Sequence, residues 1–133
     1  MSEPMTVEVV SPERVLYSGQ ATMVITRTLG GGEIAFQPNH AAFLAVLDNN
    51  HTRIYLADGS VQDVAVHGGF VEVSNNTVSI LSDAAELGSD IDIDRAQRAK
   101  ERAEDRLRHQ HDAEAVSALS RAQARLDAAR TGW

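Results

Sequence analysis

The feature that most constrains the fold of this chain is an abrupt change of residue composition at Gly88. Residues 5–82 hold nearly all of the β-branched and aromatic residues, and turn-forming clusters interrupt them at short intervals. From Asp90 to Thr131 the chain has no glycine and no proline, and alanine is abundant. The first pattern is typical of short strands joined by turns, and the second is typical of helices. We therefore expect an α+β protein, with an antiparallel β-sandwich over residues 1–88 and an antiparallel helical hairpin over residues 89–133.

The first part divides into short segments of β-branched and aromatic residues separated by turn signals, a spacing that predicts a sandwich or a barrel. The triple glycine Gly30–Gly32 lacks the lysine of a phosphate-binding loop and does not open onto a helix, so it indicates a hairpin turn. The Gly68–Gly69 pair falls where the alternating valines change face, which indicates a bulge or a turn. The predicted strands cover residues 5–10, 14–18, 21–28, 33–36, 43–47, 52–57, 61–67, 69–74 and 77–82.

The second part shows helical periodicity. Apolar residues recur three or four positions apart in two stretches: Ile93, Ala96, Ala99, Ala103 and Leu107, then Val116, Leu119, Ala122 and Leu126. The intervening RHQHDAE contains poorer helix formers, and Asp112 within it is suited to cap a second helix. This favours a hairpin of two helices of about 18 residues each, although one unbroken helix is nearly as well supported. Large apolar residues are few, so the hairpin is expected to be held only modestly against its surroundings.

The charge is unevenly distributed. Residues 1–88 carry three arginines against ten acidic residues, which gives −7, whereas residues 89–133 carry nine basic and nine acidic residues, which gives zero. The first part has no basic patch, so nucleic acid is not an expected partner. No apolar run approaches the ~20 residues of a membrane span, and the N-terminus lacks a targeting pattern, so direct membrane insertion is not expected either. The chain contains no cysteine, which excludes disulfides and thiolate chemistry.

Three aspartates at alternate positions, Asp90, Asp92 and Asp94, followed by Glu101, approach the ligand spacing of a calcium-binding loop. Such a loop needs a glycine at its sixth position and a helix before it. Here the sixth residue is Arg95, and the preceding segment has the alternation of a strand. The interpretation that we favour is a helix start, in which Asp90 or Asp92 caps the exposed N–H groups.

Other site chemistries lack a supporting pattern. The serines do not form a G-x-S-x-G nucleophile elbow, and the five histidines do not have the spacing of metal ligands. His109 and His111 lie two residues apart, so a helix would direct them to different faces. We therefore expect no catalytic residue, no metal site and no enzyme acting by itself.

The order of several short motifs does carry information. The runs GEIAFQPNHAAFLAVL, VHGGFVEVSNNTVSILSDAAE and IDIDRA occur in this order before and at the start of the helical part. In order and distance they resemble the epsilon subunit of the bacterial and chloroplast rotary ATP synthase, over essentially the whole chain. Many relatives have a glycine and a second proline in the loop that here contains Asn39 and Ala42. Asparagine tolerates the left-handed conformation of that glycine, but the missing proline puts the rigidity of the loop in doubt.

The resemblance implies an ATP site at the start of the first helix. In the family, Ile/Leu-Asp-x-x-Arg-Ala is a nucleotide-binding signature, and a glutamate upstream and two arginines on the second helix complete the site. The two arginines here are four residues apart, so one helix face would direct both at phosphates. The residues that match are Glu86, Ile91, Asp92, Arg95, Ala96, Arg121 and Arg125.

The resemblance also implies a role. The family is a non-catalytic rotor subunit that contacts the central-stalk gamma subunit and the polar loops of the membrane c-ring, here through Glu33, Asn39 and His40. Its mobile helices reach the catalytic alpha and beta subunits when extended and inhibit ATP hydrolysis. No cofactor is required, and ATP, with or without magnesium, is a regulatory ligand. The implied location is peripheral, within the ATP synthase on the cytoplasmic face of the bacterial plasma membrane. The alternative is a stand-alone nucleotide-sensing module with the same two-part fold.

Overall fold

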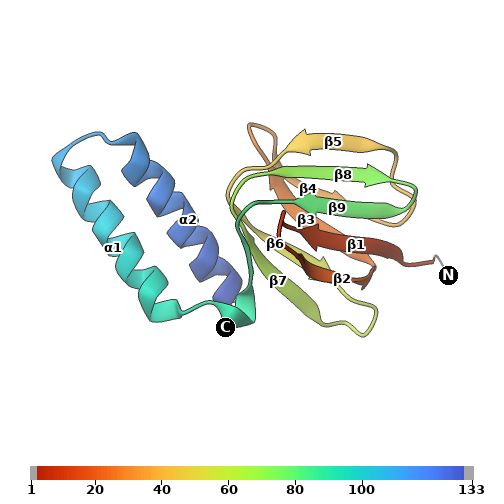
Figure 1. Cartoon of the computed structure of the whole chain (residues 1–133). Helices are drawn as coiled ribbons and strands as arrows, with labels where there is room; N and C mark the ends of the chain where they lie inside the picture. The colour runs from red at the N-terminus through yellow and green to blue at the C-terminus, as the bar shows by residue number, and fades with distance from the viewer. Residues whose placement is uncertain (1–2, 131–133) are drawn as a thin grey trace.

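The computed structural model describes residues 3–130, which form ten strands, a short 3-10 helix and two α-helices (Figure 1). The strands pack as a sandwich and the helices form a hairpin beside it, which confirms the predicted fold class. The strands are β1 (Met5–Val10), β2 (Val15–Ala21), β3 (Met23–Thr28), β4 (Gly32–Phe36), β5 (Phe43–Val46), β6 (Asn50–Tyr55), β7 (Val61–Val66), β8 (Phe70–Ser74), β9 (Thr77–Leu81) and β10 (Ala85–Leu87). The helices are η1 (Gly88–Asp90), α1 (Ile93–His109) and α2 (Ala113–Ala129).

Each sheet of the sandwich has five strands within the described residues, in the orders β2-β1-β9-β8-β5 and β10-β7-β6-β3-β4. Neighbouring strands are antiparallel except for β1 and β9, so the predicted antiparallel sandwich contains one parallel pair. A parallel pair requires a long connection, and here most of the sandwich separates β1 from β9. The short edge strand β10 was not among the predicted strands.

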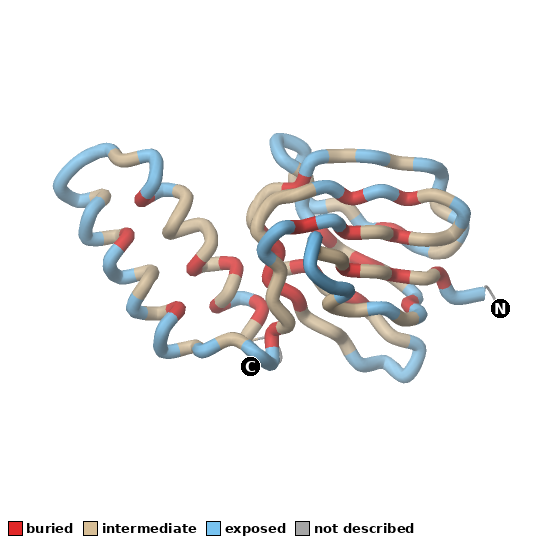
Figure 2. Tube along the Cα trace, viewed as in Figure 1, coloured by how far each residue is buried: buried red, intermediate tan, exposed pale blue. Residues whose placement is uncertain are grey.

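The core lies between the two sheets. Burial alternates along the strands, so that Met5, Val7 and Val9 of β1 face inward while their neighbours face outward. Other strands contribute the fully buried Phe36, Ile54 and Ile80, and Figure 2 shows the buried positions along the inner faces. A fully buried side chain of this size contributes about 1.5–3 kcal/mol. The sandwich therefore has a core of its own, built from residues of the strand-rich part.

The Gly68–Gly69 pair carries the chain from β7 in one sheet to β8 in the other. Both residues have positive φ angles, 72° for Gly68 and 106° for Gly69, which glycine adopts at little cost. A Cβ atom on Gly69 would also collide with the backbone oxygen of Leu81. The predicted turn is thus a crossover between the two sheets, and its second glycine is needed for two independent reasons.

Replacement of Gly69 by alanine is expected to destabilise the protein more than replacement of Gly59. Gly59 has a similar φ of 88°, but open space surrounds its missing Cβ, so Gly59→Ala should lose only the conformational term of about 1–2 kcal/mol. Gly69→Ala should lose the same amount of unfolding free energy, and the collision with Leu81 should lower the stability further. Denaturant unfolding of both variants measures the difference, and equal losses would show that the backbone around Gly69 relaxes freely.

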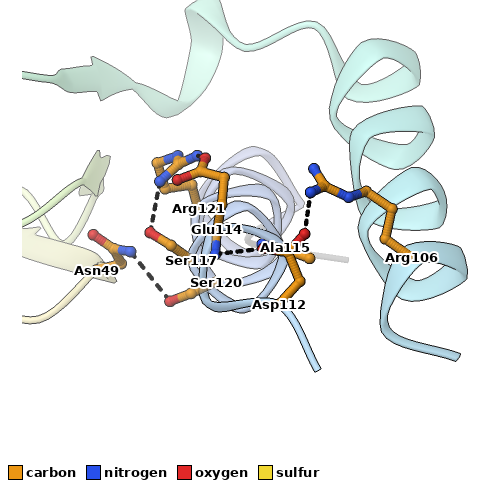
Figure 3. Close-up of polar contacts among 8 residues, drawn as sticks. All are labelled: Asn49, Arg106, Asp112, Glu114, Ala115, Ser117, Ser120 and Arg121. Carbon is orange, nitrogen blue, oxygen red and sulfur yellow. Dashed lines mark hydrogen bonds and ion pairs between the residues drawn. The ribbon is translucent and has the colours of Figure 1, made fainter. Parts of the chain in front are cut away.

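The helices begin at side-chain caps. Asp92 accepts a hydrogen bond from the N–H of Arg95 at 3.0 Å, so the aspartates near α1 start a helix, as favoured over a calcium loop. Asp112 accepts from the N–H groups of Glu114 and Ala115 at 2.9 and 3.3 Å, and it pairs with Arg106 of α1 (Figure 3). These contacts satisfy orphan donors at the start of α2 and close the turn between the helices. The structure thus contains the hairpin and not the single long helix.

The hairpin contacts the sandwich through α2, which lies against β6 and β7, while α1 packs on the other side of α2 (Figure 1). Ala65 faces away from the sandwich core but is 0% exposed, because α2 covers it. Asn49 donates a hydrogen bond to Ser120 across this contact at 3.3 Å (Figure 3). Several buried residues of α2 are alanines, which bury little apolar area each, so the hydrophobic hold on the hairpin is modest.

Candidate functional site

A cavity of about 390 Å³ lies where β10, the start of α1 and α2 meet. It contains every residue predicted for the ATP site except Arg121. It also contains Asp90, Ala99 and Arg102, which the motif did not identify. Its lining residues are Glu86, Asp90, Ile91, Asp92, Arg95, Ala96, Ala99, Arg102 and Arg125.

Three segments position these side chains. The edge strand β10 presents Glu86, and η1 leads the chain into the cap residue Asp92. Along α1, residues three, four and seven positions apart share a face, which places Arg95, Ala99 and Arg102 side by side. Arg125 reaches the cavity from α2. The cavity therefore exists as described only while the hairpin lies against the sandwich.

Glu86 is the contact point between the two parts of the chain. Its Oε1 atom accepts a hydrogen bond from Nε of Arg125 at 2.6 Å and lies 3.1 Å from Nε2 of His67. The hydrogen bond with His67, followed by the hydrogen bond and charge of Arg125, lowers the pKa of Glu86 to about 2, although partial burial opposes the shift. Glu86 is therefore ionised at neutral pH and holds Arg125 in a fixed orientation.

The cavity is lined by three carboxylates and three arginines, and the arginines provide groups that can bind an anion. Arg95 and Arg102 are exposed, and their guanidinium groups form no ion pair with another residue of the described chain. Arg125 uses its Nε for Glu86, which leaves its terminal nitrogens as donors. Guanidinium groups match phosphate oxygens in geometry and charge, and the N-terminus of α1 adds a favourable dipole. These three arginines, of which Arg95 lies in the first turn of α1, can therefore bind a polyphosphate.

Arg121 is engaged elsewhere. Its guanidinium donates to Oγ of Ser117 at 2.7 Å and to Oε1 of Glu114 at 2.9 Å, both on the same helix (Figure 3). Residues four and seven positions earlier lie on the same helix face, so these acceptors are within reach. Of the two arginines expected to converge on the phosphates, only Arg125 lines the cavity in this state, and Arg121 bonds to acceptors on its own helix.

Two residues at the site, Arg102 and His67, were not predicted from the sequence. Arg102 lies seven residues after Arg95, so helical periodicity was sufficient to find it. His67 precedes Glu86 by nineteen positions and lies in a turn, so no local pattern connects the two residues. The pairing arises because β7 and β10 are neighbours in one sheet.

The predicted ring and stalk contacts occupy two ends of β4. Asn39, in the loop after β4, has a left-handed φ of 67°, as expected for a position that often contains glycine, and its N–H donates to Asn76 at 2.8 Å. His40 follows in the same loop and packs edge-on against Phe36 with 5.0 Å between the ring centroids. Glu33 lies at the opposite end of β4, where Arg53 pairs with it at 2.9 Å. The structure therefore does not place Glu33 beside Asn39 and His40.

Two searches of the described residues 3–130 gave no site. No group of three or more potential metal ligands lies close enough together to hold an ion. None of the helices in this part of the chain has the length and apolar character needed to cross a membrane.

Comparison with known proteins identifies the family. Residues 4–88 match the family described as ATP synthase delta/epsilon chain, beta-sandwich domain, and residues 89–130 match its long alpha-helix domain. The chain belongs to the ATP synthase delta/epsilon chain family. An ATP synthase epsilon chain from Desulfitobacterium hafniense strain Y51 is 44% identical over 98% of this chain and 99% of its own length. One from Brevibacillus brevis is 52% identical over 77% of each chain.

These relatives confirm the resemblance to the bacterial epsilon subunit, which is a non-catalytic subunit of ATP synthase. Similar folds occur in solved assemblies. A chain in the OSCP/F1/c-ring structure of Euglena gracilis mitochondrial ATP synthase matches 93% of this chain and 80% of its own length, with a TM-score of 0.81 and 17% identity. A chain in the central stalk/c-ring structure from Tetrahymena thermophila matches 67% and 70%, with a TM-score of 0.53 and 21% identity. At these identities the matches concern the fold.

Proposed function

We propose that this epsilon-family chain is a rotor subunit whose hairpin regulates ATP hydrolysis and whose cavity between sandwich and hairpin binds ATP as the regulatory ligand. The observation that carries the proposal is the cavity itself. Residues from β10, α1 and α2 that are scattered over the sequence line one space with three arginines. Its volume of about 390 Å³ lies within the usual range of about 300–1,000 Å³ for small-ligand sites.

The arginines are the expected phosphate ligands. Arg95 projects from the first turn of α1 and Arg102 from the middle of the same helix, and Arg125 projects from α2 with its Nε held by Glu86. A triphosphate would bridge the two helices, and Glu86 would keep Arg125 aimed into the cavity instead of toward solvent. Ile91, Asp92 and Ala96 line the same space, and magnesium would act through the phosphates.

ATP binding would control whether the hairpin is docked on the sandwich. The site is assembled only in the docked form, so ATP stabilises that form in proportion to its concentration and affinity. In the released form, Arg125 loses Glu86 and becomes available, with Arg121 on the same helix, to acidic segments of the catalytic subunits, where the extended hairpin blocks hydrolysis. ATP and the catalytic subunits would then compete for the same element.

The sandwich supplies the rotor contacts in this proposal. Val46, Phe70 and Leu81 are cross-strand neighbours on the outer face of one sheet, and each is close to half exposed. An apolar row of this kind on a subunit surface is typical of a binding interface. We assign it to the central-stalk gamma subunit, and Glu33 to the polar loops of the c-ring. The chain would thus lie peripherally on the cytoplasmic face of the bacterial membrane, as part of the assembled enzyme.

Calorimetric titration of the full chain with ATP, with and without magnesium, tests the ATP site. Saturable heat of binding at one site is the expected result. In a separate measurement with labels on the two parts, ATP should make the distance between sandwich and hairpin shorter or more uniform. Inorganic phosphate at the same ionic strength is the control for simple charge attraction. Heat changes that phosphate reproduces, or no binding at millimolar ATP, would reject the nucleotide site.

Loss of the Asp112 cap is expected to open the hairpin. Asp112 accepts two backbone N–H groups of α2 and pairs with Arg106, so Asp112→Ala removes the contacts that favour a turn and leaves residues that tolerate a helix. The population should shift about five- to thirtyfold toward the extended form. Because the chain has no cysteine, labels on Asp94→Cys and Asp127→Cys report the separation of the helices.

The matched control is Asp105→Ala, which removes an exposed carboxylate from α1 that pairs with Arg108 but caps no helix. This variant should keep the short distance of the parent. Equal distances in all three proteins would show that the hairpin is a fixed structure.

A further inference from the structure

His67 is a buried histidine that no part of the motif includes. It lies in the turn after β7, its side chain is 3% exposed, and its Nε2 atom is 3.1 Å from Oε1 of Glu86. The same oxygen accepts the hydrogen bond from Arg125 at 2.6 Å. One carboxylate oxygen therefore serves two donors, one from the sandwich and one from the hairpin.

The geometry assigns the proton of the neutral His67 ring to one nitrogen. Glu86 is ionised, so it only accepts, and Nε2 of His67 must carry a proton in order to donate to it. The neutral and the charged ring then differ by the proton on Nδ1. This atom is buried and has no hydrogen-bond partner among the residues that the structure describes. The hydrogen bond to Glu86 thus survives in both states, and only the charge beside Glu86 changes.

His67 also lines a second cavity, of about 350 Å³, on the outer side of the sandwich together with Phe70, Leu81 and Asp83. The charged groups that face His67 are Glu86 on β10, Arg125 on α2, and Asp83, which precedes β10 and lines the same cavity.

The three residues divide between the parts that separate. His67 and Glu86 both belong to the sandwich, so their contact persists when the hairpin leaves, whereas Arg125 leaves with α2. With a neutral His67, an approaching Arg125 meets an uncompensated carboxylate. With a protonated His67, it meets a carboxylate that is already neutralised and a second cation next to it, which weakens the attraction.

We propose that His67 is a positioning residue for Glu86 and that its protonation controls how firmly Arg125 holds the hairpin against the sandwich. The inference deepens the proposed function and rests on the hairpin being mobile. Docking is firm when His67 is neutral and loosens as the pH falls and the ring gains a proton.

The test measures docking in the full chain with labels on Ala57→Cys and Ala113→Cys, two exposed positions on the sandwich and on α2. The docking constant is expected to rise about three- to tenfold between pH 6 and pH 8. His67→Gln keeps an N–H group for Glu86 but never carries a charge, so its docking should be independent of pH and close to that of the parent at pH 8. His67→Leu lacks the donor and should dock more weakly than His67→Gln at every pH.

A matched control is available in the same interface. His51 pairs with Asp63 at 2.6 Å beneath the hairpin, and His51→Gln should leave the pH profile of the parent unchanged. A parent protein without pH dependence, or a His67→Gln protein with the profile of the parent, would overturn the role of His67. If one of these outcomes is observed but ATP still alters the label distance in all variants, only the inference about His67 fails. If neither ATP nor Glu86→Gln alters the distance, the mobile hairpin itself is rejected.

Discussion

A chain that ends at Gly88 is expected to remain folded and to lose all control of ATP hydrolysis. The buried hydrophobic core between the sheets is formed within residues 5–80 of the strand-rich part, so it stays intact without the helices. The face that α2 covers carries His51, Arg53 and Asp63 beside Ala65, so its exposure adds little apolar surface. Thermal unfolding should therefore remain cooperative, with a Tm close to that of the full chain.

The functional consequences of this truncation are separable. Binding to the stalk subunit should persist, because the apolar row of Val46, Phe70 and Leu81 is retained. ATP binding should disappear, because Arg95, Arg102 and Arg125 are removed. In the reassembled enzyme, hydrolysis should lose its restraint while synthesis continues. Co-purification with the stalk subunit and hydrolysis assays measure these outcomes, and a truncated chain that folds but does not bind the stalk would contradict the division of roles.

Replacement of Arg125 by alanine is expected to weaken ATP binding at least tenfold, whereas replacement of Arg121 should have little effect in the docked form. Arg125 lines the cavity, and charge-assisted hydrogen bonds contribute about 1.5–3 kcal/mol each. Arg121 instead bonds to Ser117 and Glu114. Titration of both variants with ATP measures how much affinity each one loses.

Two controls make this comparison specific. Arg125→Lys keeps the charge but loses the planar fork, so it should fall between the parent and Arg125→Ala. Arg98→Ala removes an exposed arginine of α1 outside the cavity and should bind ATP as the parent does. A larger loss for Arg121→Ala than for Arg125→Ala would show that the nucleotide-bound hairpin has another arrangement of α2.

The sequence by itself determined the features that depend on neighbours along the chain. Segments of β-branched and aromatic residues between turn signals predicted nine of the strands, and the absence of glycine and proline from Asp90 to Thr131 indicated the helices. Asp92 and Asp112 cap the helices as expected, because a capping side chain bonds to N–H groups only two or three residues away. Four of the nine cavity residues, Ile91, Asp92, Arg95 and Ala96, belong to one short motif that the family resemblance identified.

The tertiary structure decided which distant residues meet. The strand β10 has three residues and forms because β7 offers it an edge, so its position depends on pairing and not on local preference. Arg121 and Arg125 are equivalent by spacing, but only packing of α2 on the sandwich brings Arg125 to Glu86 and leaves Arg121 to acceptors on its own helix. His67 acquires its role through the same sheet, because the ring reaches Glu86 across two adjacent strands. Contacts of this kind depend on long-range packing, which no local sequence pattern encodes.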